Sequence, residues 1–297
     1  MLKSLVGLKG LSNSLAKMFK SSEKKPLSQQ KYILLDPRYE IIENIGSGGM
    51  SDVYTAYDLL IPTYSGKDNL KAIKVLNPKF SDCDEAIYSL ESEYIIGQKL
   101  THKSLVKCYN FVSNDKNSFL VMEFLKGKTL NQLKREIVGL WSNDQKINLL
   151  RKLSESLAYT HANFVVHGDL KPSNIFICNN GILKLIDFGL SSSPNRRPPN
   201  TSYGFSLKFA SPERILGSEP SNADDLYAFG CVAHIVLTGK HPFGNISSLE
   251  ASNLNLMPQQ ISGIDRKTQI IINATLSFDP VTRANNAQEL YSFFKNL

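Results

Sequence analysis

Residues 167–189 decide the fold of this chain and read HGDLKPSNIFICNNGILKLIDFG. Two short apolar runs in this stretch are separated by Asn180-Gly181, a dipeptide that is preferred in two-residue hairpin turns. A turn there places Asn174 opposite Asp187, and directly opposed Cβ atoms in a hairpin lie about 4.5–5.5 Å apart. An amide oxygen and a carboxylate at that separation can bind a hard cation such as Mg²⁺ that carries nucleotide phosphates. The alternative is a polar hairpin end without a metal.

A glycine-rich turn lies upstream, at residues 45–54, which read IGSGGMSDVY. Glycines at a turn allow backbone N–H groups to approach a phosphate with no side chain in the way. The alternative is a simple hairpin. A dinucleotide-binding fold is disfavoured, because residues 52–57 continue as a strand whereas that fold needs a helix directly after the glycines.

The next apolar run, residues 70–76, reads LKAIKVL and is predicted to be a strand. Side chains alternate along a strand, so Ala72 and Lys74 share one face. A small residue beside a cation allows a flat base to approach while the cation meets a phosphate. The alternative is a lysine that snorkels from an edge strand.

Composition and charge limit the class of protein. The 297 residues contain 34 basic and 27 acidic side chains and are 42% apolar, which is normal for a folded soluble protein. Residues 1–31 carry seven lysines and one glutamate, so residues 32–297 hold 27 basic and 26 acidic side chains and are nearly neutral. Nucleic-acid binding rests on a dense basic face, so we expect no nucleic-acid partner. Four scattered cysteines without C-x-x-C spacing favour a reducing cytoplasm over a disulfide framework or a zinc site.

The order of patterns along the chain predicts an α+β fold. Short β-rich runs alternate with glycine-rich turns over residues 39–76, and long helical periods dominate from Asn143 onward. A β-rich first part and a helical second part indicate two segregated lobes. Apolar runs reach about a dozen residues, whereas a membrane-spanning helix needs about 20.

Five motifs in order resemble the signature set of the eukaryotic-type (Hanks-type) serine/threonine protein kinases, most closely the bacterial branch. They are Gly46–Tyr54, Ala72–Lys74, His167–Asn174, Asp187–Gly189 and Ser211–Glu213. The resemblance covers roughly residues 38–297 and implies the two-lobed kinase fold. It divides the chain into a tail and linker at 1–31, an N-lobe at 32–121, a hinge at 122–125 and a C-lobe at 126–297.

The resemblance also implies roles for individual residues, with ATP and Mg²⁺ as the cofactors and proteins as the substrates. Asp169 would accept the proton of the substrate hydroxyl, Lys171 would steady the transferred phosphoryl group, and Lys74 would bind phosphates with Glu93 as its partner. Glu93 is preferred to Glu91 because its spacing to His102 matches the family. Asn174 and Asp187 would hold the metal. The residues expected at the nucleotide are Ile45, Gly46, Ser47, Gly48, Gly49, Met50, Ser51, Asp52, Val53, Ala72, Lys74, Met122, Glu123 and Leu125.

Further matches concern the C-lobe. Glu213 and Arg283 match the family's buried ion pair, and Asp225 matches an acid that supports the catalytic loop. Lys171 resembles serine/threonine rather than tyrosine kinases. His167 is expected to support Phe188 by packing, and the other histidines are treated as structural.

Three positions depart from the family pattern. Ser51 replaces the third glycine of the loop and Ser211 replaces an alanine, and both changes should be harmless. Gly168 replaces the arginine that reads a phosphate on the activation loop, which puts switching by that phosphate in doubt. The loop of 21 residues between Gly189 and Ser211 is nevertheless expected to be autophosphorylated, first at Thr201, Ser202 or Ser206.

Two other functions stay open at this point. A small-molecule phosphotransferase shares the phosphoryl-transfer core and often has His-Gly-Asp, but it does not require Lys171 or Ser211–Glu213. A non-catalytic scaffold is the second alternative, and the intact Lys74, Asp169 and Asp187 disfavour it.

The tail at residues 1–20 has the pattern of a basic amphipathic helix. It could lie on an anionic membrane surface, act as a transport signal, dock on a partner or on the kinase body, or remain a flexible end. The expected location is the cytoplasm, with peripheral membrane association or export to a host cell left open. The sequence gives no indication of the oligomeric state.

Overall fold

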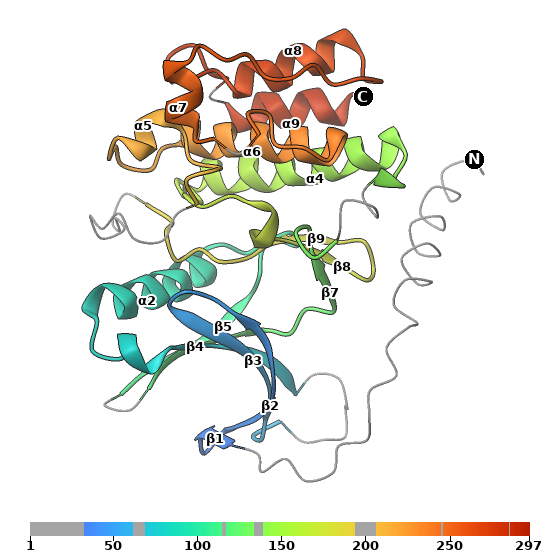
Figure 1. The fold of residues 1–297 in the computed structure, drawn as a ribbon. Helices are drawn as coiled ribbons and strands as arrows, with labels where there is room; N and C mark the ends of the chain where they lie inside the picture. The colour runs from blue at the N-terminus through green and yellow to red at the C-terminus, as the bar shows by residue number, and fades with distance from the viewer. Residues whose placement is uncertain are drawn as a thin grey trace, which may run out of the picture.

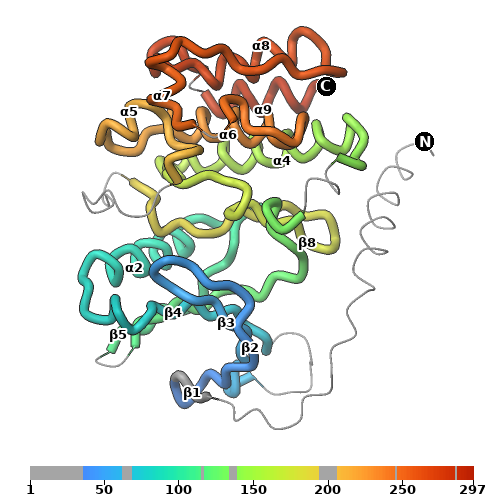
Figure 2. Tube along the Cα trace, in the orientation of Figure 1, coloured from blue at the N-terminus to red at the C-terminus, as the bar shows by residue number. Residues whose placement is uncertain are grey.

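The computed structural model describes residues 33–61, 69–114, 117–133, 139–193, 206–244, 246–284 and 286–297. A β-rich lobe is followed by a helical lobe, so the predicted α+β fold class is confirmed (Figure 1). Figure 2 shows the same division along the trace, with the blue to green half below the green to red half. The predicted helix at residues 1–20, Thr201 and Ser202 lie outside the described residues. None of the described helices is long and apolar enough to cross a membrane.

The first lobe is built on a six-stranded antiparallel sheet with the order β1-β2-β3-β4-β6-β5. Central β4 and β6 bury aliphatic and aromatic side chains on both faces, which is why they read as nearly continuous apolar runs. The strands are β1 (Ile33–Asp36), β2 (Tyr39–Ser47), β3 (Ser51–Asp58), β4 (Leu70–Leu76), β5 (Cys108–Ser113) and β6 (Ser118–Glu123). A short 3-10 turn, η2 (Pro78–Phe80), follows β4.

Helix α2 (Asp84–Lys99) packs against β5 and β6. Acidic residues in its first turn and Lys99 in its last complement the helix dipole. Its buried side chains include Ala86, Leu90, Glu93 and Ile96, which recur at helical spacing on one face. Glu93 is therefore a charge on an otherwise apolar face, and it needs a cationic partner there.

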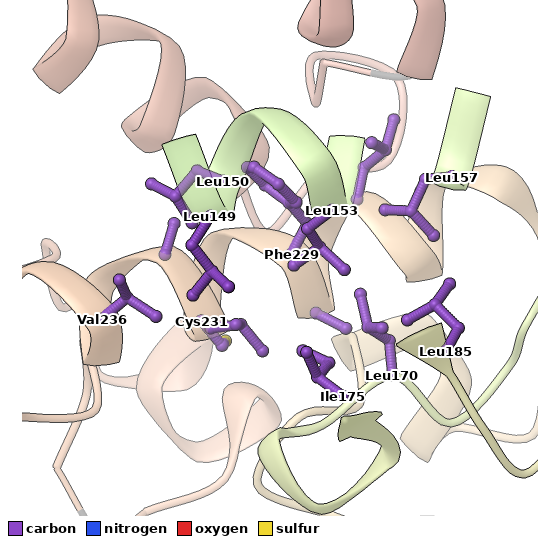
Figure 3. Packing of buried hydrophobic residues seen from close by; sticks show 14 of the residues in the cluster. Leu149, Leu150, Leu153, Leu157, Leu170, Ile175, Leu185, Phe229, Cys231 and Val236 are labelled. Carbon is purple, nitrogen blue, oxygen red and sulfur yellow. The ribbon is translucent and has the colours of Figure 1, made fainter. Parts of the chain in front are cut away.

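The second lobe surrounds α6 (Asn222–Thr238), which is buried on nearly all sides. Leucines of α4 (Asn143–Ala162) pack around Phe229 of α6, as Figure 3 shows. A capping box formed by Ser142 and Gln145 begins α4. The remaining elements are β7 (Gly127–Thr129), η3 (Pro172–Asn174), β8 (Ile175–Cys178), β9 (Leu183–Leu185), α5 (Pro212–Ile215), α7 (Ser248–Asn253), α8 (Arg266–Thr275) and α9 (Ala287–Lys295).

The hairpin between β8 and β9 corrects one expectation. Ile177 pairs with Leu183, so the loop contains the three residues 179–181 and not two. A two-residue turn of type I′ needs positive φ at both central positions, but only Gly181 of the Asn180-Gly181 pair has it, with φ 79°. The loop is the three-residue type in which a final glycine adopts the left-handed conformation.

The register between the strands therefore shifts by one residue. Ile186, not Asp187, lies opposite Asn174, and the Ile186 N–H donates to the Asn174 carbonyl at 3.0 Å. The prediction that Asn174 and Asp187 form a directly opposed pair is wrong. The two residues still end neighbouring strands, because Asp187 follows Ile186 directly.

Arg283 is buried in the second lobe, with a side chain that is 0% exposed. Its guanidinium donates to both carboxylate oxygens of Glu213, at 2.6 and 3.1 Å, and to three carbonyls. This network attaches the loop before α9 to α5, as the sequence match implied.

We expect Arg283→Met to lower the free energy of unfolding by about 3–5 kcal/mol, because it leaves the Glu213 carboxylate partly buried without its cation. Urea unfolding measures the change. Arg266→Met removes an exposed arginine from α8 and serves as the control. A loss no larger than that of the control would contradict the structural role.

His241 follows α6 and connects it to the segment before α5. Its Nε2–H donates to the Lys208 carbonyl at 2.7 Å, and its Nδ1 accepts from the Phe243 N–H. Burial lowers the pKa of His241 to about 4 from 6.5. The ring must be neutral, because a second proton on Nδ1 would point at the Phe243 N–H, which is itself a donor.

The unfolded chain binds the His241 proton below pH 6.5 while the folded chain does not, so stability falls as the pH drops from 6.5 toward 4. We expect this group to contribute a loss of roughly 2 kcal/mol between pH 6.5 and 5. Urea unfolding at the two pH values measures it, with His241→Gln as the comparison. Equal pH dependence of both proteins would refute the assignment.

Candidate active site

Lys74 joins the two lobes through a pair of carboxylates. From the centre of β4, its Nζ donates to Glu93 Oε2 at 2.7 Å and to Asp187 Oδ1 at 2.8 Å. Burial lowers the pKa of Lys74, but the carboxylates of Asp187 and Glu93 outweigh burial and raise the pKa above its ordinary value. The lysine is thus a fixed cation at the junction of β4, α2 and the segment after β9. The structure pairs it with Glu93, as expected, and not with Glu91.

A second residue of α2 reaches the same segment and was missed in the sequence. Ser89 lies one helical turn before Glu93, and its Oγ–H donates to the Gly189 carbonyl at 2.7 Å. The signal was available, because residues four apart share one helix face. Helix α2 therefore holds Asp187–Gly189 at two points.

Asp187 departs from ordinary strand geometry. Its φ is 67°, a left-handed conformation that is strained for a residue with a side chain. Partial burial alone would raise the pKa of Asp187, but the Lys74 ammonium outweighs it and lowers the pKa to about 2. The following Phe188 packs on the ring of His167, with centroids 4.8 Å apart. His167 is thus a packing residue, as the sequence indicated.

Asp169 is held by donors on both carboxylate oxygens. Lys171 Nζ lies 2.5 Å and Asn174 Nδ2 3.2 Å from its Oδ2, while the Ser206 backbone N–H donates to its Oδ1 at 3.2 Å. Burial raises the pKa of Asp169, and Lys171 opposes that shift. The side chain is consequently oriented before any ligand arrives. Ser206, expected as a phosphorylation site, lies directly beside this carboxylate.

The loop that carries Asp169 rests on Asp225 of α6. The Asp225 carboxylate accepts the N–H groups of His167 at 2.8 Å and Gly168 at 2.9 Å. His161 Nε2 lies 2.8 Å from the same carboxylate, so this histidine has an acidic partner that sequence spacing did not reveal. Burial works against ionisation of Asp225, but the hydrogen bond to His161 outweighs it and lowers the pKa.

The residues expected at a nucleotide fall into two groups. Gly46–Asp52 form the end of β2, the turn and the start of β3, with the Gly48 N–H donating to the Ser51 carbonyl at 2.9 Å. The second group is apolar and forms part of one hydrophobic cluster with Ile186. Its members are Met50, Val53, Ala72, Met122 and Leu125.

Glu123 and Ile45 differ from these groups. The Glu123 Oε1 accepts from Lys184 Nζ at 2.5 Å and from the Lys107 N–H at 2.8 Å, so this carboxylate oxygen is engaged within the protein. Ile45 is 42% exposed on β2.

Asn174 and Asp187 have the donors that a divalent cation such as Mg²⁺ requires. The Asn174 amide nitrogen donates to the Asp169 carbonyl at 2.8 Å, and its Oδ1 accepts from the Ser173 hydroxyl at 3.4 Å, which leaves a second lone pair for a cation. One Asp187 oxygen contacts Lys74 and the other is available. Two oxygen ligands suit Mg²⁺, which is commonly held by one or two protein groups together with substrate phosphates. No cluster of three His, Cys, Asp or Glu side chains that could hold a metal occurs among the described residues.

Ser211 has a larger role than the sequence suggested. It is fully buried, its Oγ–H donates to the Asp224 carboxylate, and the same oxygen caps α5 by accepting from the Arg214 N–H. An alanine at this position would leave the buried Asp224 without one donor. Ser191 is also buried and donates to the His167 carbonyl at 2.9 Å.

Comparison with known proteins gives a consistent result. A family model described as the protein kinase domain matches residues 39–295. "Probable serine/threonine-protein kinase PknB" of Lactococcus lactis is 31% identical over 266 residues, which cover 85% of this chain and 41% of the relative. "Serine/threonine-protein kinase PrkC" of Bacillus subtilis is 29% identical over 267 residues, covering 87% of this chain and 40% of the relative.

A third relative, "Serine/threonine-protein kinases PknA" of Corynebacterium glutamicum, is 30% identical over 269 residues, covering 86% of this chain and 55% of the relative. The chain thus spans about half or less of the length of these curated relatives.

We expect Ser89→Ala to loosen the segment that contains Asp187. A net hydrogen bond contributes about 0.5–1.5 kcal/mol, so amides of residues 187–190 should exchange with deuterium about 2- to 12-fold faster. Hydrogen–deuterium exchange with mass spectrometry measures the change, and Ser89→Thr, which keeps the hydroxyl, should restore slow exchange. Unchanged exchange in the alanine variant would remove Ser89 from the site.

Proposed function

Because this chain belongs to the protein kinase domain family, we propose that it transfers the γ-phosphoryl group of ATP to serine or threonine hydroxyls of proteins. The observation that carries the proposal is the position of Lys74 between Glu93 and Asp187, at 2.7 and 2.8 Å. A scaffold that only binds partners has no need of a cation fixed between two carboxylates from different lobes. Phosphoryl transfer does, since it depends on positioning and on charge stabilisation.

The side chains divide the work by their chemistry. Lys74 binds the α and β phosphates, with the glycine-rich turn covering them and the apolar cluster around Ala72 and Met122 contacting the base. Asp169 accepts the proton from the attacking hydroxyl, and its fixed orientation supports this role. Lys171 contributes positive charge beside the transferred group.

A divalent cation, which we propose is Mg²⁺, would be held by Asn174 and Asp187. When bound, it supplies positive charge to the phosphate oxygens. The low pKa of Asp187 keeps its carboxylate ionised at neutral pH, which supports this assignment.

A protein acceptor is favoured over a small alcohol by the segment that follows Ser206. The Ser206 N–H donates to the Asp169 carboxylate. Ser211 and the Glu213–Arg283 ion pair fix the segment to the second lobe. A small-molecule phosphotransferase has no use for such a platform beside the acceptor carboxylate. The printed names of the relatives support serine and threonine as the acceptor residues.

We also propose autophosphorylation on residues 191–206, which includes Thr201 and Ser202. Buried Ser191 is a poor acceptor within this range. Mass spectrometry of protein incubated with ATP tests this part of the proposal, and phosphate confined to other regions would contradict it.

We expect Asp169→Asn to lower kcat by about 10²–10⁴-fold, the usual contribution of a positioned general base. The fold and ATP affinity should be retained, because the amide has the shape of the carboxylate. Phosphoamino-acid analysis with labelled ATP measures transfer to protein, small alcohols serve as competing acceptors, and calorimetry measures ATP binding. Asp82→Asn, at an exposed position, is the control. Undiminished turnover, or transfer to alcohols alone, would refute the proposal.

A further inference from the structure

A hollow of about 720 Å³ opens beside the catalytic loop on the second lobe. Its lining comes from the loop of Lys171, the segment of Ser206 and Lys208, the end of α6 with Lys240, and the chain around Leu130. Among the described residues that line it are three lysines, and none is an aspartate or glutamate. The charged side chains of the described lining are therefore cationic, and one of them, Lys171, is paired with Asp169 at the edge of the hollow.

The polar side chains of the described lining are either lysines or uncharged groups. Lys171 is paired with Asp169, while Lys240 is exposed to solvent. His241 is neutral, since its ring donates to a carbonyl and burial keeps its pKa near 4. Uncharged lining residues with N–H or O–H groups that can donate are Asn131, Ser173 and Gln259.

The hollow begins where a substrate hydroxyl would bind. Lys171 and Ser206 both line it, and both also donate to the Asp169 carboxylate, at 2.5 and 3.2 Å. A peptide whose serine or threonine reaches Asp169 must therefore pass its flanking residues along this surface.

We propose that this hollow selects protein substrates with acidic side chains close to the phosphorylated serine or threonine. The inference rests on the proposed kinase activity and names the class of substrate. Carboxylates or phosphates on the peptide would meet lysine ammonium groups and N–H donors. Lysine or arginine side chains would meet like charge and find no carboxylate in the described lining.

Synthetic peptides with one acceptor test the inference. Their flanks carry alanine, glutamate, phosphoserine or lysine, and kcat/KM is measured for each. Exposed ion pairs change affinity by about 1.4- to 5-fold each, so the glutamate and phosphoserine peptides should exceed the alanine peptide by several-fold and the lysine peptide should fall below it. At about 1 M salt, where the Debye length is near 3 Å, these differences should disappear.

Lys240→Glu places a carboxylate in the hollow without touching Asp169. Relative to the alanine peptide, it should lower kcat/KM for the glutamate peptide and raise it for the lysine peptide. Lys240→Gln removes the cation without adding a carboxylate and should give both effects at a smaller size. Lys267→Glu makes the same change of charge at an exposed position on α8 and should have none of these effects.

Equal kcat/KM for all peptides, a preference for lysine, or identical behaviour of Lys240→Glu and Lys267→Glu would overturn the inference while leaving the kinase activity in place. Absence of transfer to every peptide would overturn the proposed function, and the inference with it.

Discussion

The contact on which the site depends is the buried ammonium of Lys74 between two carboxylates. A cation on a central strand is costly to bury unless charge and hydrogen bonds compensate for it. Glu93 supplies one carboxylate from the apolar face of α2, and Asp187 supplies the other from the second lobe. The ammonium compensates the buried Glu93 carboxylate, and the two carboxylates together compensate the ammonium. The position of Asp187 therefore depends on how α2 packs against the sheet, because Lys74 connects Asp187 to Glu93.

A second set of polar contacts fixes strand β9, which leads to Asp187. Lys184 of β9 is buried, and its Nζ donates to the Leu105 carbonyl at 2.9 Å and to Glu123 at 2.5 Å. The Leu185 N–H also donates to the Ser104 carbonyl at 2.8 Å. Strand β9 is thus attached to the chain between α2 and β5, so Asp187 is fixed both by its strand and by Lys74. Its strained φ is maintained because both ends of the segment are held.

The sequence predicted the parts of the site that follow from spacing within one element, and less of what depends on tertiary packing. The face shared by Ala72 and Lys74 follows from strand alternation, and the choice of Glu93 came from family spacing. The hairpin register was wrong because Asn-Gly is compatible with two loop lengths, and packing selects between them. The pairing of Ser211 with Asp224 and of His161 with Asp225 could not be read from the sequence, since each joins segments that meet only in the folded chain.

Gly168 illustrates how the catalytic loop keeps its shape without the family's arginine. The main-chain N–H groups of His167 and Gly168 donate to the Asp225 carboxylate and fix the loop to α6. These hydrogen bonds do not depend on the side chain at position 168. Gly168 has φ 75°, a conformation that costs glycine little. The geometry of Asp169 is consequently set by a carboxylate in the core of the second lobe and by the donors Lys171, Asn174 and Ser206. No described hydrogen bond to the Asp169 carboxylate comes from residue 168 itself, and the carboxylate is oriented by Lys171, Asn174 and the Ser206 N–H in the unmodified chain.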